Sequence, residues 1–352
     1  MSTTPSSDPL VPQPHYLSLR RRFISLPTLL SFALSGTFLV FLLTRFDIHF
    51  DEIWESVRSS DPGSLFLAFV LFYITIPIRG YRWRLIMTNA EVYRQADISP
   101  PSVLVHSEMI LINLFANSIS LFRVGDAYRA FLMSSRFRVS FFGTIGTIMA
   151  ERILSTGMIF ILLLVSGIGL LQGGLGETVP RVTASAMGLF ALMGLTLLIM
   201  RLFGLRFARL LPHRIQGMYG HFQQGALGSF RQLPLPIVVS GVVGLLSAAR
   251  LYFVIHAFGF DVNLALVLFA SLAPTLLLSI PVTPGGLGLV ELGLTSILVQ
   301  APTLSLTNAT AITLIDRSIT YVSILVIGGA AFAIRQVINV RNPLQDNPAN
   351  SP

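Results

Sequence analysis

The sequence predicts an all-α polytopic membrane protein with six full spans and two re-entrant helical hairpins, arranged as inverted-topology repeats. Three observations support this fold class. The 352 residues are 53% hydrophobic and 11% charged, with a mean hydropathy of +0.73, whereas soluble domains carry about 25% charged residues. Long apolar segments recur along the chain. One of them, Val262–Val299, contains the run S-I-P-V-T-P-G-G-L-G-L-V-E, which no lipid-facing helix can continue through.

The N-terminal part combines a polar tail, an apolar run and an acidic stretch. Met1–Leu19, rich in Pro and Ser, is predicted to be a disordered cytoplasmic tail. Three arginines, Arg20–Arg22, then precede the apolar run Phe23–Thr44, which is long for a signal peptide and lacks a cleavage site. We therefore predict a retained first span there. The acidic, amphipathic stretch Asp47–Ser60 is typical of a helix that lies at the membrane interface.

Seven more apolar segments follow, most of them long enough to cross a membrane. They are Ser64–Thr88, Ser102–Phe122, Ser140–Leu171, Val182–Met200, Pro236–Gly259, Val262–Val299 and Ala309–Ile334.

The placement of arginines decides which segments cross. If all eight crossed, the arginines of 123–138 and of 201–214 would lie opposite Arg20–Arg22, against the positive-inside rule. If Ser102–Phe122 instead enters and leaves on the cytoplasmic side, and Val262–Val299 on the outer side, nearly all arginines fall inside. We therefore predict six crossings, two re-entrant hairpins and both termini in the cytoplasm, in a cell (inner) membrane. In this reading Arg79, Arg82 and Arg84 anchor a span at the cytoplasmic interface, and the stretch 82–94 falls inside.

An internal repeat emerges from this topology. Ser118–Asp126 aligns with Ser279–Leu287 at an offset of 161, and Glu151-Arg152 aligns with Asp316-Arg317 at an offset of 165. A single transmembrane domain, 20–340, is expected, with one repeat at about 20–172, a second at about 181–340 and a cytoplasmic tail at 341–352. Because the two halves begin on opposite faces, the repeats are predicted to be inverted, which places a substrate site between them.

The charged residues inside the membrane are the candidate site. They follow the two hairpins or lie in the spans after them: Arg123, Asp126, Arg129, Glu151, Arg152, Glu291, Asp316 and Arg317. One interpretation is structural, with the acid–Arg neighbours forming buried ion pairs that lock the bundle. The other is functional, with arginines that bind an anionic headgroup and carboxylates that balance them or bind a coupling proton.

The glycines at 285, 286 and 288 offer a second element of this site. Their backbone N–H groups could approach a phosphate closely, and the helix after Gly288 would add its positive end. The alternative interpretation is a plain turn.

Several functional classes are disfavoured. The chain has no cysteine, which excludes disulfides and thiolate metal sites, and it contains no motif for a cofactor. His106-Ser107-Glu108 is more typical of a packed polar patch than of a metal site. All 24 basic residues are arginine, which suits phosphate but is also what a GC-rich genome produces. Because the arginines lie at span ends, no nucleic-acid surface is expected.

Five blocks, in order, resemble one family. They are R-G-Y-R-W-R-L-I-M, N-S-I-S-L-F-R-V-G-D-A-Y-R-A, A-E-R-I-L-S, P-V-T-P-G-G-L-G-L-V-E and D-R-S-I-T-Y. The family is the lysylphosphatidylglycerol synthase transmembrane (flippase-like) domain family, including YbhN-like proteins. The resemblance implies a site made of Arg123, Gly125, Asp126, Arg129, Glu151, Arg152, Pro284, Gly285, Gly286, Gly288, Glu291 and Arg317. The chain departs from the family at Ser120, often Pro, and at Ser155, commonly an acid.

The resemblance implies a function. Members are thought to move aminoacylated or other polar lipids between leaflets, so we expect a lipid transporter whose partners are a lipid substrate and the bilayer. The soluble aminoacyl-transfer domain of the true synthases is not seen in this sequence, so no enzymatic activity is expected. A homodimer is compatible with this reading. The alternatives are an accessory or catalytic protein acting on a polyprenyl-phosphate-linked sugar, and a non-transporting scaffold.

Overall fold

The structure is a computed structural model that describes residues 55, 57–120, 123–171, 178–210, 212–277 and 283–341. Within these ranges every regular element is helical. The predicted first span, both terminal tails and most of the predicted interface helix 47–60 lie outside the described residues. The fold class is therefore confirmed as an all-helical membrane protein in the part of the chain that the structure describes.

Five helices are long and apolar enough to cross a membrane. They are α4 (Pro62–Asn89), α8 (Phe141–Leu171), α9 (Thr178–Leu210), α11 (Pro234–Ala257) and a composite helix in which π-helical turns join α14 (Leu306–Arg317) to α15 (Gly329–Arg341). Each corresponds to a predicted span. The sixth span, Phe23–Thr44, stays a prediction.

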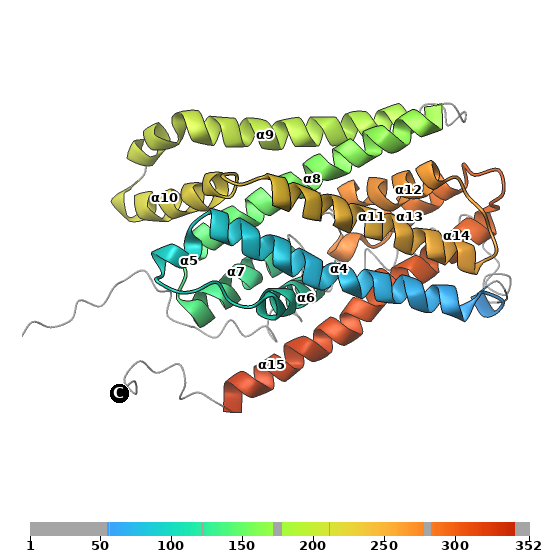
Figure 1. Cartoon of the computed structure of the whole chain (residues 1–352), viewed down its shortest axis with the longest axis horizontal. Helices are drawn as coiled ribbons and strands as arrows, with labels where there is room; N and C mark the ends of the chain where they lie inside the picture. The colour runs from blue at the N-terminus through green and yellow to red at the C-terminus, as the bar shows by residue number, and fades with distance from the viewer. Residues whose placement is uncertain are drawn as a thin grey trace, which may run out of the picture.

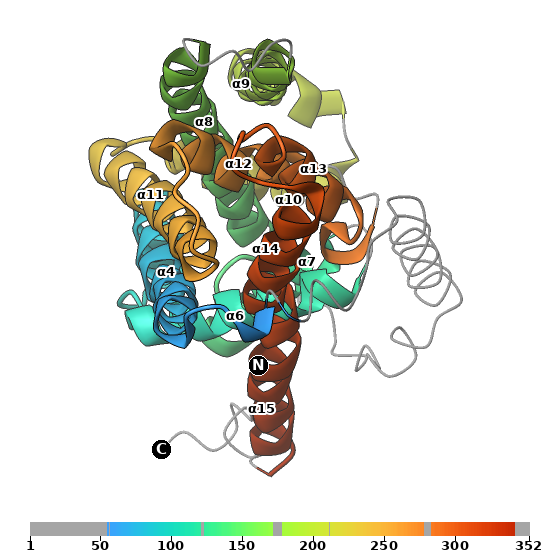
Figure 2. The ribbon, with the colours of Figure 1, turned by 90° about the vertical axis from the view of Figure 1, so that its right-hand side faces the viewer.

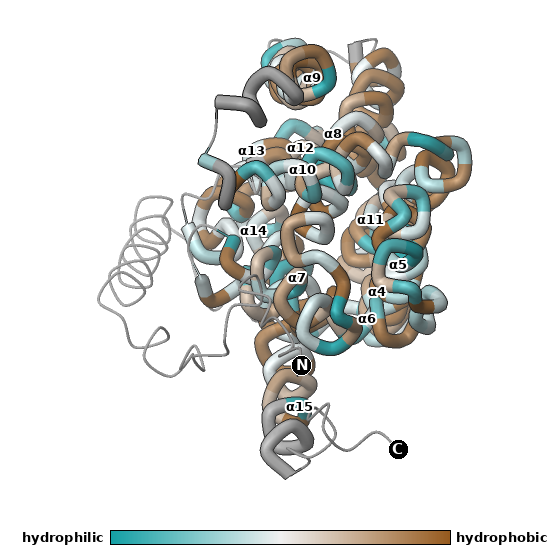
Figure 3. Tube along the Cα trace, turned by 90° about the vertical axis from the view of Figure 1, so that its left-hand side faces the viewer, coloured by the Kyte–Doolittle hydropathy of each residue, from teal (hydrophilic) through white to brown (hydrophobic). Residues whose placement is uncertain are grey.

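The long helices form a lengthwise bundle. Figure 1 shows α4, α9 and α11 running along the long axis, with α9 at one side. Many residues of α9 are hydrophobic, as the brown parts of its trace show (Figure 3), and several are exposed, among them Leu192 at 61% and Leu202 at 62%. Such a surface is stable against lipid and not against water. Figure 2 shows α15 projecting beyond the other helices.

Two short helix pairs replace continuous spans where the hairpins are predicted. The pairs are α6 (Val103–Ile119) with α7 (Val124–Phe137), and α12 (Leu264–Leu277) with α13 (Leu289–Leu298). The members of each pair contact each other, and each helix is shorter than the roughly 20 residues that a crossing needs. In Figure 1 the two pairs lie toward opposite ends of the long axis.

Both helices that follow a break begin after a residue with positive φ. Arg123 precedes α7 with φ 54°, and Gly288 precedes α13 with φ 83°. These residues are 165 positions apart, as are the starts of α8 and α14 at Phe141 and Leu306. The spacing found between charged pairs in the sequence is therefore also the spacing between helix starts.

Two predicted linkers are helical instead. The stretch 129–138, part of the arginine-rich segment 123–138 that is expected on the cytoplasmic side, belongs almost entirely to α7, where Arg129 is only 4% exposed. The stretch 201–214 is largely the end of α9 and the start of α10 (His213–Gly228). Arginine is a good helix former, so an arginine-rich stretch can be helical.

The remaining helices, α5 (Val92–Gln95) and α10, pack against the long helices of the bundle. The short α5 follows α4, and α10 packs along α8 so closely that a Cβ on Gly225 would lie 2.1 Å from the carbonyl oxygen of Gly143. Helices α4 and α11 are antiparallel neighbours. The Asp61 N–H donates to Ala257 O at one end, and Asn89 Nδ2 donates to Gln232 O at the other, each at 2.8 Å.

The apolar core has two parts. One, around Leu251, Phe269 and Ile312, joins α11 to the second helix pair, and the other, around Trp83 and Met133, joins α4 to the first pair. The charged residues lie between and beside these two parts.

Candidate functional site

Glu151 on α8 is the centre of the first charged group. Its carboxylate accepts from Arg82 Nη2 on α4 at 2.9 Å and from Arg129 Nη2 on α7 at 2.7 Å. All three side chains are at most a tenth exposed. The Arg129 guanidinium also lies 4.3 Å from the ring centre of Trp83, a cation–π contact. One carboxylate therefore holds two buried arginines from two other helices.

Asp126 organises the first break. Its carboxylate is ion-paired with Arg152, lies 3.7 Å from Arg123 Nε and accepts from Asn113 Nδ2 at 3.0 Å. Unlike the Glu151 group, this cluster can be reached from outside, since the side chains of Arg123 and Arg152 are 32% and 29% exposed. It is the accessible side of the charged core.

Gly125 is required by the packing at this break. Its N–H donates to Asn117 Oδ1 at 2.9 Å, and a Cβ would lie 2.5 Å from the carbonyl oxygen of Asn113. No side chain fits there, so the close approach of the two backbones requires glycine.

Glu291 organises the second break. Its carboxylate accepts from Arg317 Nε and from the Gly288 N–H, both at 2.7 Å. Arg317 Nη2 donates to Gly285 O at 2.9 Å, which ties the turn to the last span. Beside this group, Asp316 is ion-paired with Arg250 of α11.

The backbone N–H donors of the turn after Pro284 bind acceptors that lie nearby in the chain. The N–H of Gly286 donates to Thr283 O and that of Leu287 to Pro284 O, both at 3.2 Å. The Gly288 N–H is bound by Glu291. The amide donors expected to cradle a phosphate at 286 and 288 are thus already engaged, and the positive start of α13 faces a carboxylate of its own chain.

The acid–Arg neighbours in the sequence do not pair with each other. Glu151 binds Arg82 and Arg129, whereas Arg152 binds Asp126; likewise Asp316 and Arg317 bind different partners. The expectation of Glu151-Arg152 and Asp316-Arg317 pairs is therefore wrong. Consecutive helical residues point about 100° apart, so adjacent side chains cannot meet.

The two halves repeat the same pairing. Arg152–Asp126 and Arg317–Glu291 both join residues 26 positions apart, and each residue of the first pair lies 165 positions before its counterpart. Arg82–Glu151 and Arg250–Asp316 join residues 69 and 66 positions apart. Arg129 has no counterpart, because Leu294 stands at the equivalent position.

The two breaks meet at Tyr321. Its hydroxyl donates to Ser118 O at the end of α6 at 2.9 Å, and a Cβ on Gly285 would be 2.3 Å from its ring. Tyr321 lies in the π-helical turn Ser318–Val322, a type of distortion that is frequent at functional sites.

Sequence reasoning missed some of these residues. Arg82 is buried and binds Glu151, so its assignment as an interface anchor is wrong. Arg250 was not singled out, although a lone arginine in the apolar segment 236–259 is a usable signal. Asn113 and Asn117 carry no such signal, because their role depends on the turn that they contact.

A polar patch surrounds His106, as the sequence predicts. Its Nε2 is 2.5 Å from Tyr93 Oη, its Nδ1 is 2.8 Å from Ser102 O, and burial raises the pKa of Tyr93. Glu108 pairs instead with Arg136 and Arg335. No group of three metal-binding side chains occurs within the residues described.

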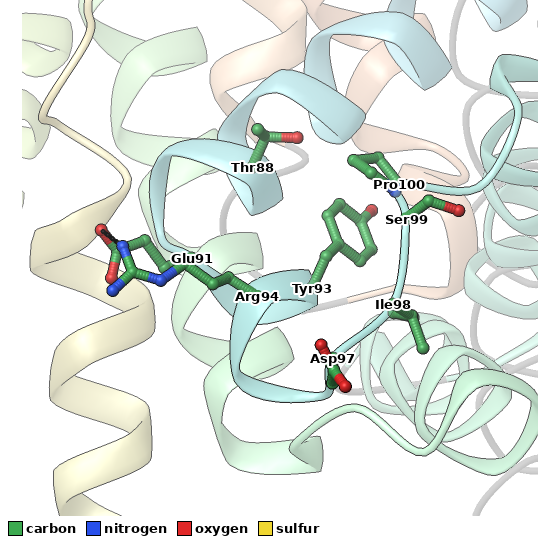
Figure 4. A pocket seen from close by; sticks show the side chains of 8 residues that line it. All are labelled: Thr88, Glu91, Tyr93, Arg94, Asp97, Ile98, Ser99 and Pro100. Atoms are coloured by element: carbon green, nitrogen blue, oxygen red, sulfur yellow. Dashed lines mark hydrogen bonds and ion pairs between the residues drawn. The ribbon is translucent and has the colours of Figure 1, made fainter.

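A hollow of about 510 Å³ opens beside this patch. Figure 4 shows it between the end of α4, α5 and the segment before α6, with Glu91, Arg94 and Asp97 at its rim. None of the predicted site residues lines it. The buried and half-buried ion pairs around Glu151, Asp126, Glu291 and Asp316 are the stronger candidate for a functional site.

The sequence matches one membrane-protein family and two membrane proteins. The family described as "Lysylphosphatidylglycerol synthase TM region" matches residues 28–328. A UPF0104 membrane protein of Methanocaldococcus jannaschii is 26% identical over 63% of this chain and 94% of its own length. Another UPF0104 membrane protein, from Methanothermobacter thermautotrophicus, is 24% identical over 80% of this chain and 88% of its own length. No solved structure matches.

Proposed function

The chain belongs to the lysylphosphatidylglycerol synthase TM-region family of membrane proteins, and from this premise we propose that it moves a lipid with an anionic headgroup between leaflets. The observation that carries the proposal is an imbalance of charge. Among the described residues of the first half, three core arginines, Arg82, Arg129 and Arg152, share the two carboxylates of Glu151 and Asp126. In the second half, two arginines face two carboxylates.

An excess of buried cations needs an anion. A charge inside the membrane costs several kcal/mol unless it is paired or hydrated. Guanidinium groups bind phosphate with two parallel hydrogen bonds, so a phosphate-bearing headgroup satisfies them well. The first half, and not the Gly-rich turn of the second, is therefore the proposed headgroup site.

The accessible cluster at Asp126 is the proposed entry. Arg152 and Arg123 are partly exposed, and Asp126 holds them in the absence of a ligand. An entering phosphate takes the place of the Asp126 carboxylate on Arg152. Because one anion replaces another, the exchange avoids leaving the arginine unpaired in a medium of low dielectric.

The repeated pairing supports an inverted repeat within this proposal. Two halves with equivalent ion pairs, and with helix pairs toward opposite ends of the molecule (Figure 1), suit a transporter that exposes a central site to each face in turn. The re-entrant hairpins form the two approaches to that site. The same chemistry would hold a polyprenyl phosphate, so such lipids belong in the test.

Reconstitution tests the proposal. Purified protein in liposomes is assayed with fluorescent phosphatidylglycerol, polyprenyl phosphate and neutral diacylglycerol, by following how fast the label becomes accessible to an impermeant quencher. We expect a protein-dependent rate for an anionic lipid, a roughly tenfold loss in Arg152→Gln and no loss in the exposed Arg94→Gln. Equal rates with and without protein for every anionic lipid would disprove transport.

A further inference from the structure

Arg79 differs from the other arginines of the core. It lies on α4, one turn before Arg82, and makes no hydrogen bond or ion pair with any residue that the structure describes. Its Nε is enclosed, whereas the residue as a whole is half-buried. A guanidinium group has five donors and no acceptor, so an arginine held in a bundle without a partner needs an explanation.

The carboxylates near Arg79 are already occupied. Arg79 interacts electrostatically with Arg82, Glu151 and Arg250. Glu151 is bound by Arg82 and Arg129, and Asp316 is bound by Arg250. Arg79 therefore lies near Glu151 of the first half and Arg250 of the second, as a further cation that no described carboxylate binds directly.

The position of Arg79 matches the contact between the halves. Helix α4 packs against α11, its equivalent in the second half, and Arg82 Nη1 donates across this contact to Ser240 Oγ at 2.9 Å. Arg79 lies on the same helix, three residues away. An anion bound there would touch both halves at once.

We infer that Arg79 binds the phosphate group of the transported lipid at an inner position between the two halves. The inference rests on the proposed function and names a phosphate mono- or diester as the ligand. Arg123 and Arg152 receive the headgroup at the accessible cluster, and Arg79 takes it further in, where the neighbouring guanidinium groups of Arg82 and Arg250 add to the attraction.

Replacing a purely structural arginine would lower the stability of the ligand-free protein, which is not expected for Arg79. Since Arg79 has no hydrogen-bond or ion-pair partner among the described residues, its removal leaves none of their carboxylates unpaired. Replacing it with glutamine should therefore keep or raise the stability of the ligand-free protein, as for other residues retained for function at the expense of stability. Replacing the partnered Arg129 should lower that stability, which gives a contrast within one network.

Ligand-dependent thermal stability in detergent tests the inference. The ligands are short-chain phosphatidylglycerol, glycerol phosphate and short-chain diacylglycerol, and the proteins are wild type, Arg79→Gln, Arg79→Lys and the control Arg94→Gln. We expect phosphatidylglycerol to raise the Tm of wild type and Arg94→Gln. Arg79→Gln should have an unchanged or higher ligand-free Tm and at least tenfold weaker binding, with Arg79→Lys in between.

Each outcome has one meaning. A lower ligand-free Tm in Arg79→Gln with wild-type binding makes Arg79 a structural residue and overturns the inference. An equally tight response to glycerol phosphate overturns the assignment to a lipid. Loss of binding in Arg79→Gln, with no transport by wild type in liposomes, refutes the proposed transport and retains the phosphate site. Unchanged binding and transport in Arg79→Gln overturn the inference alone.

Discussion

Glu151 is bound by two arginines, at 2.9 Å from Arg82 and 2.7 Å from Arg129, in a region at most a tenth exposed. Removing its charge leaves two guanidinium groups without a counter-ion. The cost of an uncompensated buried charge is about 3–5 kcal/mol. Glu151→Gln should therefore sharply lower the melting temperature and the yield of purified protein.

A second substitution identifies the partner. Removing one arginine as well, as in Glu151→Gln with Arg129→Met, should restore part of the lost stability. Glu151→Gln with Arg152→Met should not, because Arg152 binds Asp126. Rescue by Arg152→Met and not by Arg129→Met would show that the sequence neighbours pair after all.

Gly125 allows a matched test of close packing. In Gly125→Ala the new methyl group would lie 2.5 Å from Asn113 O and 2.6 Å from Asn117 Oδ1. Overpacking of this kind costs about 1–3 kcal/mol, so the melting temperature should fall. Gly188→Ala, where no atom lies within 4 Å, should leave it equal or higher, since alanine favours helix. Equal losses in both variants would contradict the described packing.

At the scale of elements, the last span is distorted where the two breaks meet. Its π-helical turns, Ser318–Val322 and Ile324–Gly328, interrupt the regular helix next to both short helix pairs. Tyr321 joins them through its bond to Ser118 O. A π turn places one extra residue in a helix, and here that register brings the Tyr321 ring against Gly285.

Tyr321→Phe tests this junction. It removes one hydrogen bond, worth about 1 kcal/mol, and keeps the ring. We expect a small drop in melting temperature and a clear change in the lipid translocation rate in liposomes. Tyr252→Phe, whose ring stacks on His256 and whose hydroxyl makes no described hydrogen bond, is the control. The junction has no special role if both variants transport lipid at the wild-type rate.

At the scale of the whole molecule, the proposed inverted arrangement predicts where linkers lie. Because the chain has no cysteine, single cysteines can be introduced at exposed positions. Ser135→Cys at the end of α7 should resist an impermeant thiol reagent in intact cells. Thr303→Cys, between α13 and α14, should react. Labelling of both positions from outside would rule out opposite orientations of the two halves.

What the sequence determines by itself is what depends on local composition. Long apolar runs specify the five described spans, since burial in lipid is set by the residues of the segment itself. Proline and glycine specify the break after α12, and the charged residues of the core can be named from their apolar surroundings. The candidate residues were therefore recognisable before their contacts were known.

Only the tertiary structure decides how those residues are used. Partner choice depends on helix rotation and on neighbours that are remote in sequence, such as Arg82 and Glu151, 69 positions apart. The same packing binds the Gly288 amide to Glu291 and leaves Arg79 without a partner in the part of the chain that the structure describes. Because an ion pair needs both charges at one place in space, no local pattern could show which arginine is left over.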